Sequence, residues 1–416
     1  MSAPSRAQAL APFRVRSFRF QWPADLATSW AFEMETLILG WYVLVETQSV
    51  FMLTVFASLQ YLGTLLAPMF GVVGDRIGHR NLLCGMRGLY AALATLLMSL
   101  AFLGLVTPAI VLVITAVFGL VRPSDIGMRA ALVAETMPQD RLVGAMSIQR
   151  TTQDSARIAG ALTGAGLVAA LGMGPAYLVV AGFYAVSVVL TFKAGSSRPP
   201  HTARAGAGAS PWRDLKEGLA YVWNTPHLQG AMCFAFLLNL TAFPMFTGLL
   251  PYVAKEVYFS DQTTLGYMVA SASFGALLGA MVLSRVGHTV RPARMGLVFG
   301  AGWYAMLLVF AHTPHPAAGI AILMVTGISQ SLGLIPMSAM LLRNSQAQYR
   351  GRVMGIRMLA IYGNLPGLLI SAPLIASIGF ALTATLYCAI GLAFTLLIAV
   401  RWRAHLWRRE AVANTP

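Results

Sequence analysis

Residues Gly71–Arg80, GVVGDRIGHR, gather ionisable side chains in a chain that is otherwise poor in charge. These side chains stand among glycines, directly after a long apolar run. A related stretch, SRVGH at Ser284–His288, repeats the DRIGH part of this pattern in the second half of the chain. The two stretches indicate that one structural unit occurs twice.

Composition assigns the chain to the membrane. Of its 416 residues, 57% are hydrophobic and only 10% are charged, and the mean hydropathy is +0.69. Soluble domains carry charge on about a quarter of their residues. The formal net charge of +15 comes from arginines that recur at the ends of apolar runs rather than in one patch. We therefore expect a lipid bilayer as the surroundings and no nucleic acid partner.

The apolar runs predict an all-α protein with twelve transmembrane helices, since each crossing needs about 20 mostly apolar residues. The expected spans lie near residues 22–45, 50–73, 81–105, 108–133, 142–170, 174–194, 228–256, 261–284, 293–312, 316–341, 352–377 and 379–401. A linker rich in Gly, Ser, Pro and Arg divides them into two sets of six. The predicted domains are a six-helix bundle at 1–194, a cytoplasmic linker at 195–227 and a six-helix bundle with a basic tail at 228–416. Within the linker, Trp212–Trp223 has the pattern of an amphipathic surface helix.

Orientation follows from the basic residues. Lys and Arg fall in alternate connections, and the opposite connections hold only Lys255. The positive-inside rule then places both termini and the linker in the cytoplasm, and GVVGDRIGHR in the cytoplasmic turn between spans two and three. The first twenty residues are rich in arginine and lack a cleavable signal pattern, so we interpret them as a cytoplasmic tail in a multi-pass protein of the cell membrane.

The internal repeat extends beyond these two turns. Gly160 and Gly172 correspond to Gly367 and Gly379 at an interval of 207 residues, close to the 209 residues that separate the two turns. A parallel duplication of a six-span half predicts two pseudo-symmetric bundles. That pattern is typical of alternating-access transporters, whose substrate site lies between the halves near the middle of the membrane.

The turn resembles the signature of the major facilitator superfamily, G-x-x-x-D-R-x-G-R-R. The residues that match are Gly71, Asp75, Arg76, Gly78 and Arg80. His79 stands where the family usually has Arg or Lys. This resemblance implies the major facilitator fold. It also implies that the turn acts as a latch across the cytoplasmic ends of the halves in the outward-open state.

Longer stretches resemble one branch of that family, the multidrug and siderophore efflux proteins similar to the enterobactin exporter. These are LGWYVLVETQS at Leu39–Ser49, KEGLAYVWNTPHL at Lys216–Leu228, LLPYVAKEVY at Leu249–Tyr258 and RGRVMGIRMLAIYGNLPG at Arg350–Gly367. At two places the sequence departs from the pattern of exporters in this family. Ala161 replaces a proline that many exporters carry in span five, and Gly119 precedes Arg122 where the family has glycine after arginine.

The second interpretation of the turn is purely topological. Arginine alone would satisfy the positive-inside rule. Asp75 adds an acid that this rule does not require, and the second copy has Ser284 at that place. We therefore expect Asp75 to contribute to the latch.

Acidic residues inside span one are the expected proton-coupling groups, because an ionisable side chain within the membrane costs several kcal/mol unless it is paired or wetted. They are Asp25, Glu33 and Glu35. Glu35 is favoured, since it lies near mid-span on the polar arc with Thr28 and Thr36, whereas Glu33 borders the apolar face. Asp25, near the cytoplasmic end, is expected to act as a relay.

Two further charged trios occupy spans four and five, each on one helical face. They are Arg122, Asp125 and Arg129, and Arg150, Asp154 and Arg157. They form either a structural ion-pair network or a site for an anionic substrate group that also tunes the acids of span one. In the second half, Asn239, Tyr252 and Asn364 are expected to complete an otherwise apolar substrate cavity, together with Tyr267 and Gln330.

We expect a secondary active transporter, since no G-x-x-x-x-G-K-[ST] phosphate loop occurs in the sequence. The favoured function is proton-coupled efflux of small lipophilic or amphipathic molecules, such as a drug, a secondary metabolite or a siderophore. The alternative is an importer or facilitator of a small organic anion. A membrane-embedded enzyme and a non-transporting sensor are disfavoured, because the histidines lack catalytic or metal-ligand spacing and no soluble domain is appended. No cofactor or metal is expected, and the protein is expected to be a monomer.

Overall fold

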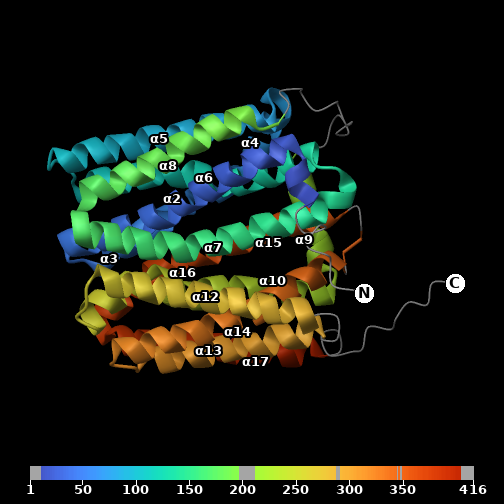
Figure 1. The fold of residues 1–416 in the computed structure, drawn as a ribbon. Helices are drawn as coiled ribbons and strands as arrows, with labels where there is room; N and C mark the ends of the chain where they lie inside the picture. The colour runs from blue at the N-terminus through green and yellow to red at the C-terminus, as the bar shows by residue number, and fades with distance from the viewer. Residues whose placement is uncertain (1–10, 196–210, 287–290, 344, 347–348, 404–416) are drawn as a thin grey trace. The chain divides into compact units, whose positions relative to one another are not determined.

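The computed structural model describes residues 11–195, 211–286, 291–343, 345–346 and 349–403. The secondary structure of these residues is helical throughout (Figure 1). The chain divides into two compact units, Met1–Ala207 with Pro251–Ser273, and Gly208–Leu250 with Phe274–Pro416. The predicted domains follow the linker and the repeat instead of this grouping, and they stay a prediction.

Six helical segments make up the first half of the chain, and the second of them is broken into three pieces. They are α2 (Arg16–Thr47), α3 (Val50–Leu59) with η2 (Leu62–Leu66) and α4 (Ala67–Ile77), α5 (His79–Phe102), α6 (Pro108–Thr136), α7 (Gln139–Leu171) and α8 (Met173–Lys193).

The linker helix and six further segments follow. They are α9 (Pro211–Trp223), α10 (Pro226–Leu237) continued by the short α11 (Leu250–Tyr252), α12 (Gln262–Val286), α13 (Pro292–Ala311), α14 (Pro316–Arg343), α15 (Arg350–Leu359) joined through a 3-10 turn at Ala360–Gly363 to α16 (Asn364–Ile378), and α17 (Phe380–Arg401).

Nine of the twelve segments are long and apolar enough to cross a membrane by length and composition, counted over the described residues. The other three fall short for two reasons. Segments α2 and α7 carry acidic and basic residues along their length, and the second segment is interrupted by the 3-10 turn at Leu62–Leu66. Two of these exceptions, α2 and α7, carry the acids predicted for span one and the charged trio predicted for span five.

The core of the first unit forms around α2, which packs against α7 and α8 (Figure 1). Four aromatic rings pack together where α2, α5, α6 and α8 meet, and the stacked rings of Tyr90 and Phe118 have centroids 4.4 Å apart. Phe32 and Tyr184 complete this aromatic group. Burial of such rings is the largest apolar contribution a single side chain can make. The aromatic group therefore holds the polar arc of α2 in a fixed position.

The start of α2 corrects one expectation, since residues 11–20 are not a tail. A 3-10 turn at Ala11–Arg14 leads into the helix at Arg16. Phe18 is 1% exposed and packs in a small core with residues of α7 and of the end of α6. Val15, Phe18 and Trp22 follow at helical spacing and give the segment an apolar face. The expected tail was inferred from the arginines of this segment.

The backbone bears out the predicted pseudo-symmetry of the two halves. Gly172 joins α7 to α8 with φ +83°, and Gly379 joins α16 to α17 with φ +81°. Such positive φ angles favour glycine. The two glycines that the sequence paired across the repeat thus form the same turn between spans five and six and between spans eleven and twelve.

Close helix crossings repeat in the same way. A Cβ atom on Gly63, in the second segment, would collide with the carbonyl oxygen of Leu120 on α6. A Cβ atom on Gly275, in the eighth segment, would collide with the carbonyl oxygen of Met324 on α14. Small residues let membrane helices approach to backbone contact. Each half therefore packs its second helix on its fourth through a glycine.

Span seven differs from a regular α-helix. Three π-helical turns interrupt it, at Leu238–Ala242, Pro244–Gly248 and Val253–Val257. Turns of this kind hydrogen-bond from residue i to i+5, are rare, and occur frequently at functional sites.

Candidate functional site

Glu35 lies in the interior of the first unit, with only 5% of its surface exposed. Tyr184 on α8 donates a hydrogen bond of 2.9 Å to one carboxylate oxygen, and Tyr177 on the same helix is 3.5 Å from the other. Tyr177 and Tyr184 are seven residues apart, about two helical turns, so both hydroxyls come from one face of α8. The carboxyl of Glu35 is thereby held between α2 and α8.

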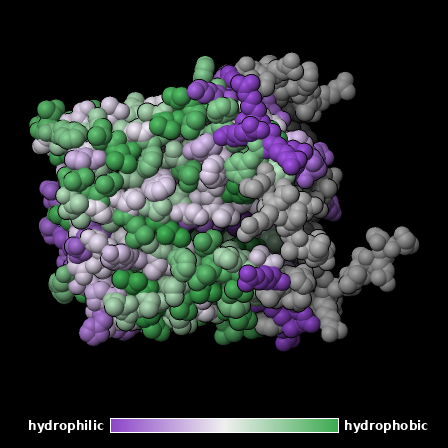
Figure 2. Space-filling view, in the orientation of Figure 1, coloured by the Kyte–Doolittle hydropathy of each residue, from purple (hydrophilic) through white to green (hydrophobic). Residues whose placement is uncertain are grey.

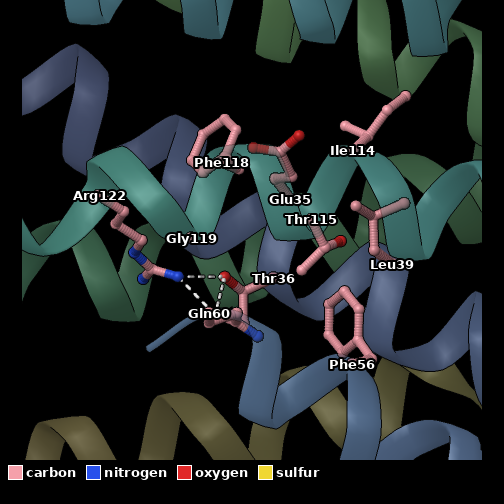
Figure 3. A pocket seen from close by; sticks show the side chains of 10 residues that line it. All are labelled: Glu35, Thr36, Leu39, Phe56, Gln60, Ile114, Thr115, Phe118, Gly119 and Arg122. Carbon is pink, nitrogen blue, oxygen red and sulfur yellow. Dashed lines mark hydrogen bonds between the residues drawn. The ribbon is translucent and has the colours of Figure 1, made fainter. Parts of the chain in front are cut away.

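A small cavity adjoins this carboxyl (Figure 3). Its volume is about 20 Å³, which is enough for one water molecule. It is lined by Glu35, Thr36, Leu39, Phe56, Gln60, Ile114, Thr115, Phe118, Gly119 and Arg122. Drug-sized ligands occupy pockets of about 300–1,000 Å³. This cavity therefore suits water or a proton beside Glu35 and is too small for the transported molecule.

Arg122 contributes a cation to the same cavity. Its guanidinium donates hydrogen bonds to the side chains of Gln60, at 2.5 Å, and Thr36, at 3.2 Å, as Figure 3 shows. The group lies 4.9 Å from the ring centroid of Phe32. Among the described residues, no carboxylate forms an ion pair with Arg122. The cavity thus combines one buried acid with one cation whose hydrogen-bond partners are neutral.

A second cluster buries four charges in the first unit, where α2, α5 and α6 meet. Arg87 on α5 bonds to Asp25, and Arg129 bonds to Asp125 on α6. The two pairs are linked, since Arg129 lies 3.8 Å from Asp25 and Arg87 lies 3.9 Å from Asp125. All four residues are at most 3% exposed. Their charges balance two against two, as buried ions require.

Neutral partners complete the network. Gln149 on α7 donates a hydrogen bond of 2.8 Å to Asp25, and Arg129 donates one of 2.7 Å to Ser29. Arg87 also bonds to the hydroxyl of Thr191. Asp25 is thus enclosed by α5, α6 and α7, which supports a structural role for this residue and leaves its proposed role as a relay as a prediction.

The charged trio of span five, Arg150, Asp154 and Arg157, forms two separate ion pairs. Arg157 pairs with Glu33 on α2 at 3.3 Å. Arg150 pairs with Asp154 one turn along α7, also at 3.3 Å, and the Arg150 side chain is 70% exposed. The trios of spans four and five therefore do not pair with each other. Arg129 of span four contacts Asp25, and Arg157 of span five contacts Glu33.

The three polar residues predicted in the second half occupy different surroundings. Asn239 is half-buried and donates to the carbonyl of Ala235 in its own helix. Asn364 is 2% exposed at the start of α16. Tyr252 packs against the core of the first unit. Their role in binding substrate stays a prediction.

The turn between α4 and α5 depends on Gly78, which ends one helix and begins the next with φ +88°. Arg76 is exposed, and Arg80 lies 5.5 Å from the ring centroid of Phe192. Gly71 lies on α4 in open space, since a Cβ there would meet nothing within 4 Å. The side chain of Asp75 lies outside the described part of the chain, so the latch stays a prediction.

His79 gives this turn a contact that the sequence did not predict. Its Nδ1 lies 3.2 Å from the Glu135 carboxylate near the end of α6. The turn is thereby joined to span four of the same unit. In the second copy of the turn, which begins at Ser284, residues 287–290 lie outside the described part of the chain.

Several residues of the site were missed from sequence. Arg87 could have been found, because it is an arginine within an apolar span, the same signal that singled out Arg122. Gln60, Tyr177 and Tyr184 carry no such signal, since isolated amides and phenols are common in membrane helices. Only the packing of α3 and α8 around α2 brings them to Glu35 and Arg122.

No group of three or more His, Cys, Asp or Glu side chains that could hold a metal ion occurs in the described part of the chain. The site is built instead from one buried carboxyl, one cation and hydroxyl donors. Groups of this kind can exchange a proton and can bind an anion.

The fold and these intramembrane charges define a helical membrane transporter. The sequence profile of the Major Facilitator Superfamily matches residues 26–368, most of the chain. The protein belongs to the major facilitator superfamily, as predicted, and its twelve helices form the two six-helix bundles of that fold. A search among curated protein sequences found no match.

Solved transporters share this architecture. A POT family transporter in complex with 5-aminolevulinic acid has a TM-score of 0.71 at 13% identity, with 94% of this chain and 96% of that chain covered. The nucleoside transporter NupG has a TM-score of 0.64 at 16% identity, with 94% and 100% covered. The human organic anion transporter MFSD10 has a TM-score of 0.65 at 15% identity, with 93% and 99% covered. Identities this low show the shared fold alone.

Proposed function

We propose that the protein is a proton-coupled exporter of small lipophilic or amphipathic molecules that works by alternating access. The observation that carries the proposal is Glu35, a buried carboxyl that accepts a hydrogen bond from Tyr184 beside a water-sized cavity. A drug, a secondary metabolite or a siderophore would be the substrate, and protons entering the cell would drive its export. The cell membrane, cytoplasmic termini and a monomeric state are part of the proposal.

Glu35 has the surroundings that a coupling acid needs. Burial disfavours an ionised carboxylate, whereas hydrogen bonds and a nearby cation favour it. Glu35 experiences both influences, since it is enclosed by α2 and α8 and shares its cavity with Arg122. A change in wetting of this cavity as the halves rearrange would alter the balance and release or take up the proton.

Contacts of the other two acids support this choice. Glu33 pairs with Arg157, and Asp25 pairs with Arg87. A carboxylate that is held by an arginine is stabilised in its ionised form. Glu35 has hydroxyl partners in place of an arginine partner, so it is the acid of α2 best suited to change its protonation during transport.

The direction of transport rests on the efflux-branch stretches quoted above, so it needs a direct test. Everted membrane vesicles would be energised, and the uptake of a panel of lipophilic fluorescent dyes would be followed. We expect uptake that collapses when an uncoupler dissipates the pH gradient. Energised uptake that occurs only in right-side-out vesicles would contradict export.

Arg122 favours a second candidate function, transport of a small organic anion. It is the one arginine of the two charged trios for which the described residues show no carboxylate partner, and arginine is well suited to bind carboxylate or phosphate groups. The same vesicles would distinguish the functions. Inhibition of dye transport by aliphatic carboxylates, lost in Arg122→Gln, would favour the anion transporter.

A further inference from the structure

Buried threonines in this protein bond to their own helices, with one exception. Thr54 donates to the carbonyl of Phe51, three residues earlier in the chain. The same local bond, to a carbonyl three or four residues earlier, is made by Thr28, Thr64, Thr152, Thr191, Thr241, Thr326, Thr383 and Thr395. Among the buried threonines of the described residues, Thr115 on α6 is the one that makes no such bond.

The hydroxyl of Thr115 faces the cavity beside Glu35. Thr115 is 5% exposed, and its oxygen has no hydrogen-bond partner within the described part of the chain. The residue lines the same cavity as Glu35 and Arg122. Figure 3 shows its side chain among those of Glu35, Thr36 and Leu39. A buried hydroxyl without a partner is destabilising, so a group inside the cavity has to satisfy it.

The wall that Thr115 belongs to is brought close to α3 by a glycine. Thr115, Gly119 and Arg122 follow at intervals of four and three residues, so they share one face of α6. A Cβ atom on Gly119 would collide with the carbonyl oxygen of Leu59, at the end of α3. This close crossing places Gln60 within hydrogen-bond distance of Arg122. The cavity is therefore enclosed between α2, α3 and α6.

The cavity is also the polar side of Glu35. On its other side stands α8, whose Tyr184 holds the carboxylate. The outward residues of α8 are apolar, since Leu178, Val186 and Val189 are all more than half exposed. Figure 2 shows mostly hydrophobic side chains over α5 and α8, with hydrophilic ones gathered toward one end of these helices. An apolar outer surface gives a proton no route to the acid, so the proton has to come through the cavity.

The size and polarity of the cavity fit one water molecule. Its volume of about 20 Å³ leaves no room for a larger ligand. A chloride ion there would meet the carboxylate of Glu35, and a metal cation would meet the guanidinium of Arg122. Water is neutral, and a buried water makes about three hydrogen bonds. Thr115 and Glu35 can supply two of these partners. Thr36, Gln60 and Arg122 line the same space.

We propose that Thr115 holds a water molecule in this cavity and that the proton reaches and leaves Glu35 through this water. In the uptake step, a hydronium ion at this place transfers one proton to a carboxylate oxygen of Glu35. A neutral carboxyl and a neutral water on Thr115 remain, and release is the reverse step. Thr115 is a positioning residue, since it holds the water and does not itself take up the proton. Its part in transport rests on the proposed function of Glu35, whereas the bound water can be tested without any substrate.

Isotope exchange of the Glu35 carboxyl tests the water. The purified full chain in lipid is transferred from light to heavy water at a pH low enough to protonate the acid. Infrared difference spectra then follow the carbonyl stretch of the carboxyl, and the band that Glu35→Gln removes identifies the residue. Thr115→Val lacks the hydroxyl at nearly the same size and should slow the exchange by about tenfold, the effect of one lost hydrogen bond on a rate. Thr115→Ser keeps the hydroxyl and should exchange like the unchanged protein.

Thr54→Val is the matched control, because its hydroxyl is satisfied within α3 and does not line the cavity. It should leave the exchange rate unaltered. Looser packing would expose Glu35 and speed the exchange, so a merely structural effect of Thr115→Val has the opposite sign. Unaltered or faster exchange in Thr115→Val would overturn the role of Thr115. Thr115→Ala removes the same hydroxyl with less bulk, and it provides the comparison if Thr115→Val does not fold.

Two further outcomes separate the ligand and the proposed function from the role of Thr115. Exchange rates should be equal in chloride and gluconate buffers, and a rate that depends on chloride would assign the cavity to an anion and contradict the bound water. No Glu35 band at any pH that the fold tolerates would contradict the proposed function itself, because the acid would never take up a proton. Slow exchange in Thr115→Val with undiminished proton flux in Glu35→Gln would exclude the acid from transport while the bound water remained supported.

Discussion

The hydroxyl of Tyr184 lies 2.9 Å from the Glu35 carboxylate and joins span six to span one. Tyr177 approaches the same carboxyl from two turns along α8. Both tyrosines are fully buried on a regular helix, so they fix the position of the acid as well as its hydrogen bonds. The coupling group proposed here is therefore oriented by the packing of two helices.

Glu35→Gln should leave substrate binding intact and abolish transport driven by a pH gradient. The amide keeps the size of the side chain and can accept a hydrogen bond from Tyr184, but it cannot carry a proton. Substrate exchange and downhill flux should persist. Proton flux into proteoliposomes on addition of substrate measures the effect, and we expect at least a tenfold reduction, about 1.4 kcal/mol in the barrier.

Glu33→Gln is the matched control for this variant, since both acids lie on α2. Glu33 pairs with Arg157, so its substitution should reduce transport without removing the proton flux per substrate. A normal signal from Glu35→Gln with none from Glu33→Gln would assign coupling to Glu33. Normal signals from both would exclude span one from the mechanism.

Arg87→Met should strongly destabilise the protein. It leaves Asp25 without its closest cation in a network that is almost fully buried. Removing one partner of a buried pair costs about 3–5 kcal/mol. Arg150→Gln removes an arginine that is largely exposed, and such pairs contribute at most about 1 kcal/mol. Thermal unfolding of the two variants in detergent should show a large difference, and similar midpoints would contradict the buried network.

Arg157→Gln should lower transport by up to about fivefold, because it leaves Glu33 without its cation and a partly exposed ion pair contributes at most about 1 kcal/mol. Two double variants identify the partner. Adding Glu33→Gln should restore much of the activity, whereas adding Asp154→Asn should not, since Asp154 pairs with Arg150. Initial rates in proteoliposomes provide the comparison. Rescue by Asp154→Asn alone would show that the pairing is wrong, and failure of both would favour a direct role for Arg157 in binding.

Gly63→Ala should prevent the close crossing of the second segment and α6. The added methyl would collide with the carbonyl oxygen of Leu120, and overpacking of this kind costs about 1–3 kcal/mol. Gly85→Ala on α5 is the control, because a Cβ there meets nothing within 4 Å. The control should be as stable as the unchanged protein or slightly more so. Yield of folded protein after size-exclusion chromatography would distinguish the two, and equal yields would contradict the crossing.

Sequence reasoning succeeded where a single helix or a repeat carries the information. The linker helix predicted at Trp212–Trp223 is α9, which begins one residue earlier. Gly172 and Gly379 were paired by spacing alone, and both adopt the same positive φ. Apolar length and glycine positions are local properties, so they can be read without knowing which helices are neighbours.

The pairing of charges was less accessible to the sequence. Periodicity placed Arg157 and Asp154 on one face of span five, but it did not show that Arg157 pairs with Glu33 of span one. Asp25 likewise pairs with Arg87 across spans one and three. A helical wheel gives the direction of a side chain and says nothing about the neighbouring helix, so the partner of a charge depends on tertiary packing.

The π-helical turns of span seven have a practical consequence for labelling. Each wide turn changes the angular phase of the helix, so side chains before and after it do not align as they would on one α-helical wheel. A scan of single cysteines along Pro226–Val257 should show an accessibility pattern that loses its 3.6-residue period at Leu238–Ala242, Pro244–Gly248 and Val253–Val257. Spin labels or cross-linkers in this span must accordingly be chosen turn by turn.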